Sequence, residues 1–257
     1  MRSHQISQVV LNEFTDENKL VNVHGIHTRF HKKLSPYEIA YIDFDEKIIR
    51  KLEEAWCKDI ETRASESLRV LKHGDLLHQP KHQKIIKALI ALHFVRGMPL
   101  VGKMEEAKEE LAAKIIADVT KAYPDHKELI EKQVAQEWPK KTKEAYPHIL
   151  EENISKVIKF LDEHGLEIGC VTGNLNLIIG DSPVITACKI ANGNLEYNVP
   201  ITEATMCIMP LTPKHLVALK THPDPDATRY IDLTEKDVAK INHLQKSQAI
   251  SEFYSKP

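Results

Sequence analysis

Residues 166–190 read LEIGCVTGNLNLIIGDSPVITACKI, and at Leu166 the spacing of apolar residues changes from helical to strand-like. Short apolar runs separated by Gly, Asn and Pro turn signals indicate strands. These runs lie at 166–171, 175–179, 184–190, 205–209 and 215–219. Residues 191–194, Ala-Asn-Gly-Asn, suit a hairpin turn. We therefore expect a β region over residues 166–220.

Upstream of this region, residues 36–164 have the character of helices. Ser35-Pro36 suits a helix start, with Ser as the N-cap and Pro at the first helical position. Apolar residues then recur at helical spacing until His73-Gly74. They are Ile49, Leu52, Trp56, Ile60, Ala64, Leu68 and Leu71. Further helices are expected at about 80–97, 103–122, 126–137 and 147–164.

The two ends of the chain complete the pattern. In the N-terminal segment 1–30, residues 6–14 suit a brief helix or strand, and residues 20–26 alternate like a strand. A last helix is expected over 234–253, capped by Thr234 with Asp237 three residues on. One or two domains are possible at this length, and a single α+β domain over 1–257 fits better. In it a central multi-helix region is flanked by N-terminal and C-terminal β segments, and a helix closes the chain.

Composition restricts the class of protein. The 257 residues are 42% hydrophobic and 28% charged, with a net charge of -2. This balance does not indicate a nucleic-acid or membrane protein, although a local basic groove could be hidden in a neutral total. Four separated cysteines and the absence of a signal peptide or membrane-length apolar run favour a cytoplasmic protein with reduced thiols. No phosphate-binding glycine loop is present, so no nucleotide cofactor is expected.

Several charged residues lie on apolar helical faces, where a buried charged side chain would need a partner. Glu53 shares a helical face with Ile49 and Trp56, and Glu61 follows near the same face. An unpaired buried carboxylate is costly, so each acid is paired, points into a cavity or reaches solvent at the margin of the apolar stripe. Arg96 shares a face with His93. Its guanidinium suits a substrate carboxylate or phosphate, or a structural ion pair with Glu53, Glu61 or Asp181.

Three further positions suggest chemistry. His4 precedes an apolar segment that would hold it in place, so its imidazole could act as a base or metal ligand, and Gln8 lies one helical turn later. Asp181, in Gly180-Asp181-Ser182-Pro183, ends an apolar run in a turn that proline stiffens. His24, His27 and His31 lie three and four residues apart, a suggestive spacing, but no acid or cysteine completes a metal pattern.

Taken together these residues resemble a bacterial family, domain-of-unknown-function family 4238. The opening Ser3-His4-Gln5-Ile6-Ser7-Gln8-x-x-Leu11-x-x-Phe14 is similar to its His-x-Val-Pro-Gln-x-x-Leu-x-x-Phe start, with Ser7 in place of Pro. Later features occur in the same order as in the family. These features are Glu53, Ile60-Glu61, Arg96 with Pro99, the turn at 180–183, Pro210-Leu211-Thr212-Pro213, Asn242 and Ala249. In the turn, Gly180 stands where the family has Ser or Thr. The resemblance supports this set of residues and implies no particular reaction.

The hypothesis is that these groups converge in one polar pocket. Its candidate catalytic residues are His4, Glu53, Glu61 and Asp181, and its candidate substrate-binding residues are Gln8, Arg96 and Ser182. Such a set suits hydrolysis of a phosphodiester or another anionic substrate, with Mg²⁺ or Mn²⁺ as a possible metal. We therefore expect a nuclease-like hydrolase, of the toxin or phage-defence kind, acting on nucleic acid or a small anion. The alternative is a non-enzymatic binding module in which the same groups form a structural ion-pair network.

Overall fold

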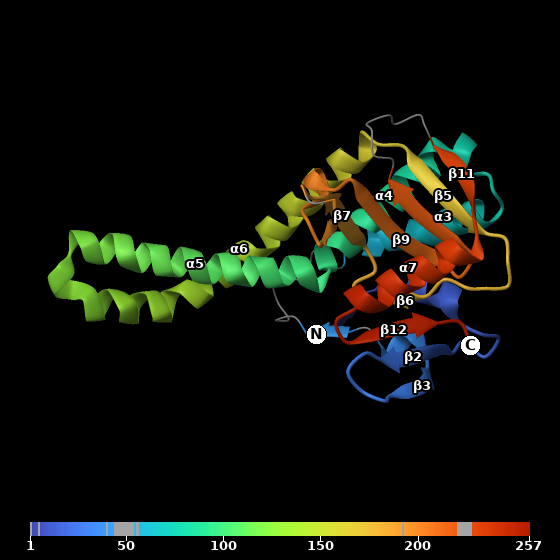
Figure 1. Cartoon of the computed structure of the whole chain (residues 1–257). Helices are drawn as coiled ribbons and strands as arrows, with labels where there is room; N and C mark the ends of the chain where they lie inside the picture. Colours follow the sequence, from blue (N-terminus) through green and yellow to red (C-terminus); the bar gives the residue numbers. More distant parts are fainter. Residues whose placement is uncertain are drawn as a thin grey trace.

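In the computed structural model, which describes residues 2–4, 6–39, 41–43, 54, 57–191, 193–219 and 228–257, helices and strands form an α+β fold (Figure 1). The largest sheet of this part has the strand order β11-β5-β10-β9-β7-β8. Its strands are β5 (Leu166–Val171), β7 (Ile185–Lys189), β8 (Leu195–Tyr197), β9 (Met206–Thr212), β10 (His215–Leu219) and β11 (Arg229–Leu233). Only the β11–β5 pair among these is parallel. The predicted β region is thereby confirmed.

A second sheet joins the two ends of the chain. Its order is β3-β2-β12-β6, from β2 (Val21–Gly25), β3 (His31–Leu34), β6 (Ile179–Gly180) and β12 (Glu252–Ser255). Strand β12 lies between β2 and β6 and is antiparallel to both. A third, two-stranded sheet pairs β1 (Arg2–His4) with β4 (Tyr41–Asp43). The run at 175–179 therefore supplies only its last residue to a strand.

The helices come mainly from the middle of the chain. They are α1 (Gln8–Leu11), α3 (Thr62–Lys72), α4 (Pro80–Arg96), α5 (Met98–Ala122), α6 (Lys127–Asp162) and α7 (Glu235–Gln248). Short 3-10 turns lie at Asn12–Phe14 (η1), Pro36–Glu38 (η2), Leu76–His78 (η4), Pro124–His126 (η5) and Ile201–Glu203 (η6), and a π-helical turn at Cys57–Glu61 (η3). Within the described ranges no helix has both the length and the apolar character that crossing a membrane requires.

Helix α4 lies in the core and positions the polar groups discussed below. Its side chains Ile86, Leu89, Ile90, Leu92 and Val95 are buried and join one apolar cluster with α3, the end of α6 and the large sheet. Each such side chain contributes roughly 1.5–3 kcal/mol by leaving water. By contrast, α5 and the first part of α6 project together away from the sheets (Figure 1).

Several boundaries differ from the sequence prediction, and α5 begins at Met98, before the expected start at about residue 103. Ser35 and Glu38 form a capping box, but it starts only the 3-10 turn η2, and strand β4 follows. Helix α3 begins at Thr62, after the π-helical turn; Ile49 and Leu52 lie outside the described residues. The stretches 126–137 and 147–164 form one helix, α6. The last helix ends at Gln248, because the following residues extend to form β12.

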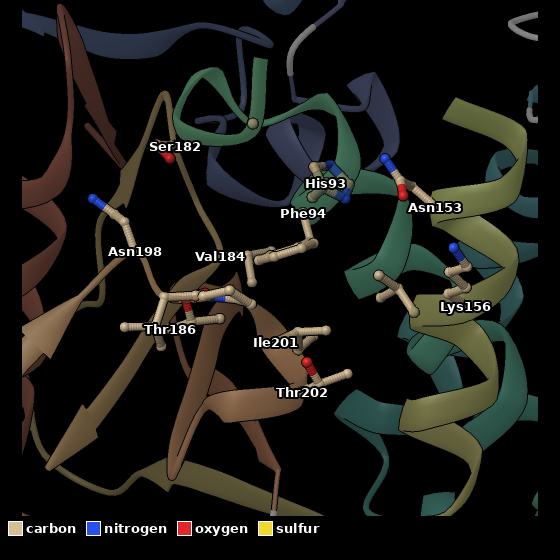
Figure 2. Close-up of a pocket in the computed structure, with 14 residues that line it drawn as sticks. His93, Phe94, Asn153, Lys156, Ser182, Val184, Thr186, Asn198, Ile201 and Thr202 are labelled. Carbon is tan, nitrogen blue, oxygen red and sulfur yellow. The ribbon is translucent and has the colours of Figure 1, made fainter. Parts of the chain in front are cut away.

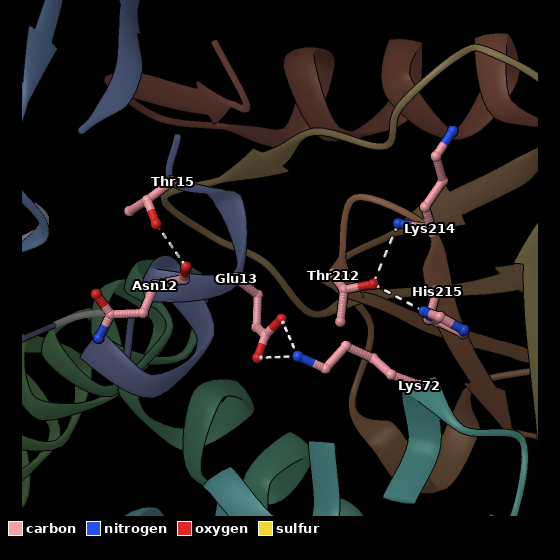
Figure 3. A network of polar contacts seen from close by, with 7 residues as sticks. All are labelled: Asn12, Glu13, Thr15, Lys72, Thr212, Lys214 and His215. Carbon is pink, nitrogen blue, oxygen red and sulfur yellow. Dashed lines mark hydrogen bonds and ion pairs between the residues drawn. The ribbon is translucent and has the colours of Figure 1, made fainter. Parts of the chain in front are cut away.

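A polar network holds the N-terminal segment against this body (Figure 3). Lys72 at the end of α3 lies 2.9 and 3.0 Å from the two carboxylate oxygens of Glu13. In the β9–β10 turn the Thr212 hydroxyl accepts the Lys214 backbone N–H at 3.1 Å and lies 2.9 Å from Nδ1 of His215. Burial lowers the pKa of His215. The negative charge of Glu13 acts in the opposite direction, and the positive charge of Lys72 lowers the pKa further. Thr212 of the Pro-Leu-Thr-Pro segment therefore stabilises the β9–β10 turn, beside the Glu13–Lys72 pair.

Candidate functional site

A buried polar cluster lies at the C-terminal end of α4. Nη1 of Arg96 is 2.6 Å from Oε1 of Glu61, and their side chains are 3% and 19% exposed. Burial raises the pKa of Glu61, but the nearby Arg96 guanidinium outweighs it and holds the pKa below its usual value. The Ser7 hydroxyl also acts on this carboxylate in the same direction. Glu61 is therefore an ionised, paired acid.

His93 belongs to the same cluster, and its neighbours define its tautomer. Its Nε2 accepts the backbone N–H of Ser7 at 3.0 Å, so this nitrogen carries no proton. Its Nδ1 donates to the Leu89 carbonyl at 2.7 Å. Burial lowers the pKa of His93 to about 4. The ring is therefore neutral at neutral pH and has both nitrogens engaged.

We call Ser7, Glu61, His93 and Arg96 the α4 cluster. It ties the segment before α1 and the π-helical turn to α4, three parts of the chain that are distant in sequence. Ser7, His93 and Arg96 are at most 4% exposed. Satisfied buried networks of this kind fix the arrangement of neighbouring segments. The structural alternative for Arg96, an ion pair with Glu61, is the arrangement observed.

Asp181 also has structural partners. Its Oδ1 accepts the N–H of Ile250 at 2.8 Å, and its Oδ2 accepts those of Ser251 and Glu252 at 2.7 and 3.0 Å. The residue is 5% exposed. Its carboxylate therefore shapes the link between α7 and β12. The neighbouring Gly180 allows this, because a Cβ there would lie 2.9 Å from the backbone oxygen of Gln245 in α7.

The other predicted site residues fall in different places. His4 lies in β1, but its side chain is outside the described part, as is all of Glu53. Gln8 begins α1, directly after Ser7. Ser182 is buried and lines a cavity that His93 also lines. The structure thus brings Glu61 and Arg96 together and gives Asp181 separate backbone partners.

The cavity has a volume of about 220 Å³ and lies between the end of α4, α6 and the segments before β7 and after β8 (Figure 2). Its lining surface is mainly apolar, although half of the lining residues have polar side chains. The lining residues are His93, Phe94, Gly97, Asn153, Lys156, Val157, Ser182, Val184, Thr186, Asn198, Val199, Pro200, Ile201 and Thr202. They include one charged side chain, Lys156, and no acid. The α4 cluster forms part of one wall through His93.

Some polar groups of the cavity are engaged and others are available. Thr186 donates its hydroxyl to the Val199 carbonyl at 2.7 Å, and Asn198 donates to Gln248. Within the described residues, the side chains of Ser182 and Asn153 make no hydrogen bond to the protein. Lys156 pairs with Glu152 at 2.6 Å but is 67% exposed, a geometry that a ligand can replace at small cost.

Most of these cavity residues have no recognisable signal in the amino-acid sequence. Asn153 and Lys156 lie three apart on α6, a spacing shared by many solvated helix faces. Asn198 has a positive φ of 58°, which its sequence alone does not reveal. In the described ranges no three His, Cys, Asp or Glu side chains are placed to hold a metal ion. Burial raises the pKa of the Cys207 thiol to about 12, so this cysteine is not an activated nucleophile.

Comparison with known proteins gives a match along nearly the whole chain. The profile of a family described as "Protein of unknown function (DUF4238)" matches residues 2–257. No curated protein and no solved structure matches the chain.

Proposed function

The chain belongs to the DUF4238 family of proteins of unknown function, and from the geometry of its own residues we propose that it binds a small ligand in the cavity between α4 and α6. The ligand has an apolar body and an anionic end. The observation that carries this proposal is the lining: a mainly apolar surface with three available donors, Asn153, Lys156 and Ser182, and no acid. Pockets of this composition bury the body of a ligand and orient it with a few polar groups.

The donors come from two sides of the cavity. Asn153 and Lys156 project from α6, and Ser182 lies opposite them beside β7 (Figure 2). Val184 and Ile201 lie between the two sides and contact the apolar part of a ligand. An ammonium group would meet Lys156 and no lining carboxylate, so cations are disfavoured. In this reading the α4 cluster is a structural network that supports one wall.

Calorimetric titration with octanoate, and with octylamine as the opposite-charge comparator, tests the proposal. We expect octanoate to bind and octylamine to bind far more weakly. Lys156→Glu should weaken octanoate binding about tenfold or more, because it removes a charge-assisted hydrogen bond. Lys159→Glu makes the same charge change on the same helix outside the cavity lining and should change affinity by less than about twofold. Equal effects of the two variants, or no octanoate binding, would contradict the proposal.

The nuclease-like hydrolase stays a prediction. Two of its candidate catalytic groups, the side chains of His4 and Glu53, lie outside the described part of the chain. Incubating the protein with DNA and with RNA, plus Mg²⁺ or Mn²⁺, measures this activity directly. Cleavage that is lost in His4→Ala would support it, whereas cleavage that is unchanged in this variant would point to a contaminant.

A further inference from the structure

The outer face of the second sheet carries three rings in a row. His31, His24 and Phe253 occupy directly paired positions on β3, β2 and β12. The His24 ring lies 4.4 Å from that of His31 at an interplanar angle of 12°, and 4.5 Å from that of Phe253 at 2°. Neighbouring strands are themselves separated by about 4.8 Å, so rings that stand upright on them stack. We call these three residues the ring row.

The two ends of the ring row differ. At the Phe253 end, Nζ of Lys246 from α7 lies 5.0 Å from the ring centroid, within cation–π range. At the other end, His31 is exposed and belongs to β3, which is an edge strand of this sheet in the part of the chain that the structure describes. His24 is fixed between them, since its Nε2 lies 3.1 Å from the Ser255 hydroxyl. The row therefore ends in the outer face of the His31 ring, at the sheet edge formed by β3; the strands of this sheet are labelled in Figure 1.

The surroundings of this end are basic. Residues 27–33, His-Thr-Arg-Phe-His-Lys-Lys, contain three exposed cations and no acid. Lys33 stands two residues after His31, hence on the same face of β3. Its acidic neighbour Asp16, 3.6 Å away, already accepts the backbone N–H groups of Asn18 and Leu20. Burial first, and then the charges of His31 and Lys246, lower the pKa of His24, which is consistent with a positive local potential.

We propose that this edge binds single-stranded nucleic acid, with one unpaired base stacked on the outer face of His31. The base continues the ring row at the same spacing, and the cations around His31 attract the adjoining phosphates. Unpaired bases stack on aromatic side chains with little dependence on sequence, whereas the faces of paired bases are covered inside a duplex. An apolar peptide would not neutralise the positive charges of Lys33 and its neighbours, so a polyanionic ligand is favoured.

Fluorescence anisotropy with a labelled single-stranded oligothymidylate tests the stacking, with chelator present so that binding and cleavage stay separate. His31→Ala should weaken binding about tenfold, the usual effect of removing one base–aromatic stack. His31→Phe keeps a stacking ring and should bind within about twofold of the wild type. His27→Ala is the matched control, because His27 is also exposed but lies outside the ring row, and it should bind like the wild type.

A polyanion without bases separates stacking from charge alone. Unlabelled polyphosphate should compete weakly and equally against the wild type and His31→Ala, whereas unlabelled oligothymidylate should compete better against the wild type. Lys33→Glu should weaken binding and reduce its salt dependence. Equal affinity of the wild type and His31→Ala for oligothymidylate, or no binding at low salt, would overturn the proposal. Octanoate titration of His31→Ala should match the wild type, so a failure here is distinguishable from a failure of the cavity proposal.

Discussion

Replacing Asp181 should destabilise the fold by an amount that its three hydrogen bonds allow us to estimate. The carboxylate accepts the N–H groups of Ile250, Ser251 and Glu252 at 2.7–3.0 Å. Hydrogen bonds to charged groups contribute about 1.5–3 kcal/mol each. Ile250 and Ser251 are exposed, so their freed amides recover bonds to water. We therefore take the low end and expect Asp181→Ala to cost about 4 kcal/mol in unfolding free energy, since bonds sharing one carboxylate are not fully additive.

Asp181→Asn is the matched variant, because it keeps the shape and removes one acceptor. Its amide oxygen can take the place of Oδ2 and accept from Ser251 and Glu252, while its NH₂ group faces the N–H of Ile250. We expect a loss of about 2 kcal/mol, intermediate between the wild type and Asp181→Ala. The amide of Ile250 should also exchange faster with solvent than those of its two neighbours.

Urea unfolding, followed by circular dichroism, measures both variants. With a slope of roughly 3 kcal/mol per molar, Asp181→Ala lowers the midpoint by roughly 1 M or slightly more. Hydrogen exchange of residues 250–252 gives the local measurement. A midpoint for Asp181→Ala equal to that of the wild type would refute this reasoning. If ligand binding or cleavage were then lost at unchanged stability, Asp181 would belong to the chemistry instead.

Three other changes test the remaining parts of the site. Between pH 6.5 and about 4 the unfolded state takes up a proton at His93 that the native state excludes, so stability should fall over this range; His93→Gln should flatten this part of a urea-midpoint profile against pH. Gly180→Ala should cost about 1–3 kcal/mol in the same assay, because its Cβ would meet the Gln245 carbonyl at 2.9 Å; no loss would mean that α7 shifts freely. Glu61→Gln should cost about 3 kcal/mol by removing the carboxylate charge that faces the buried Arg96 guanidinium, and adding Arg96→Met should restore part of it; additive losses would contradict the pairing.

The parts of the fold that the sequence predicted are those set by local periodicity. Helix α4 and the strands β5, β7, β9 and β10 carry clear apolar spacing, and their bounds lie within a few residues of expectation, whereas β8 and β11 fall outside the predicted runs. The sequence predicts two helices, at about 126–137 and 147–164, where the continuous helix α6 is found. Contact with α5, where the Trp138 indole N–H donates to the Lys108 carbonyl, supports the continuous helix. Such support depends on tertiary structure and leaves no local pattern.

The sequence predicts the site only where a buried charge needs a partner of opposite charge. A buried Arg96 needs an acid, and Glu61 was among the three partners considered. The partners of Asp181 are backbone amides about 70 residues away, and backbone amides have no sequence signature. The cavity is assembled from α6 and from the segments around β7 and β8, so Asn153 and Ser182 become neighbours only in the folded chain. The positions of such cavity residues are determined by tertiary packing and not by a local sequence pattern.

The place of β12 in the second sheet sets an order of events during synthesis. His24 and Ser255, which touch across β2 and β12, are 231 residues apart. At about 5–20 residues per second, roughly 10–50 seconds separate the emergence of the two strands from the ribosome. Throughout this interval one edge of β2 has no partner among the strands described, while its other edge is protected by β3 with its two lysines. The nascent chain therefore holds an open strand edge until residues 252–255 have been made, and this is the period in which mispairing and aggregation compete with folding.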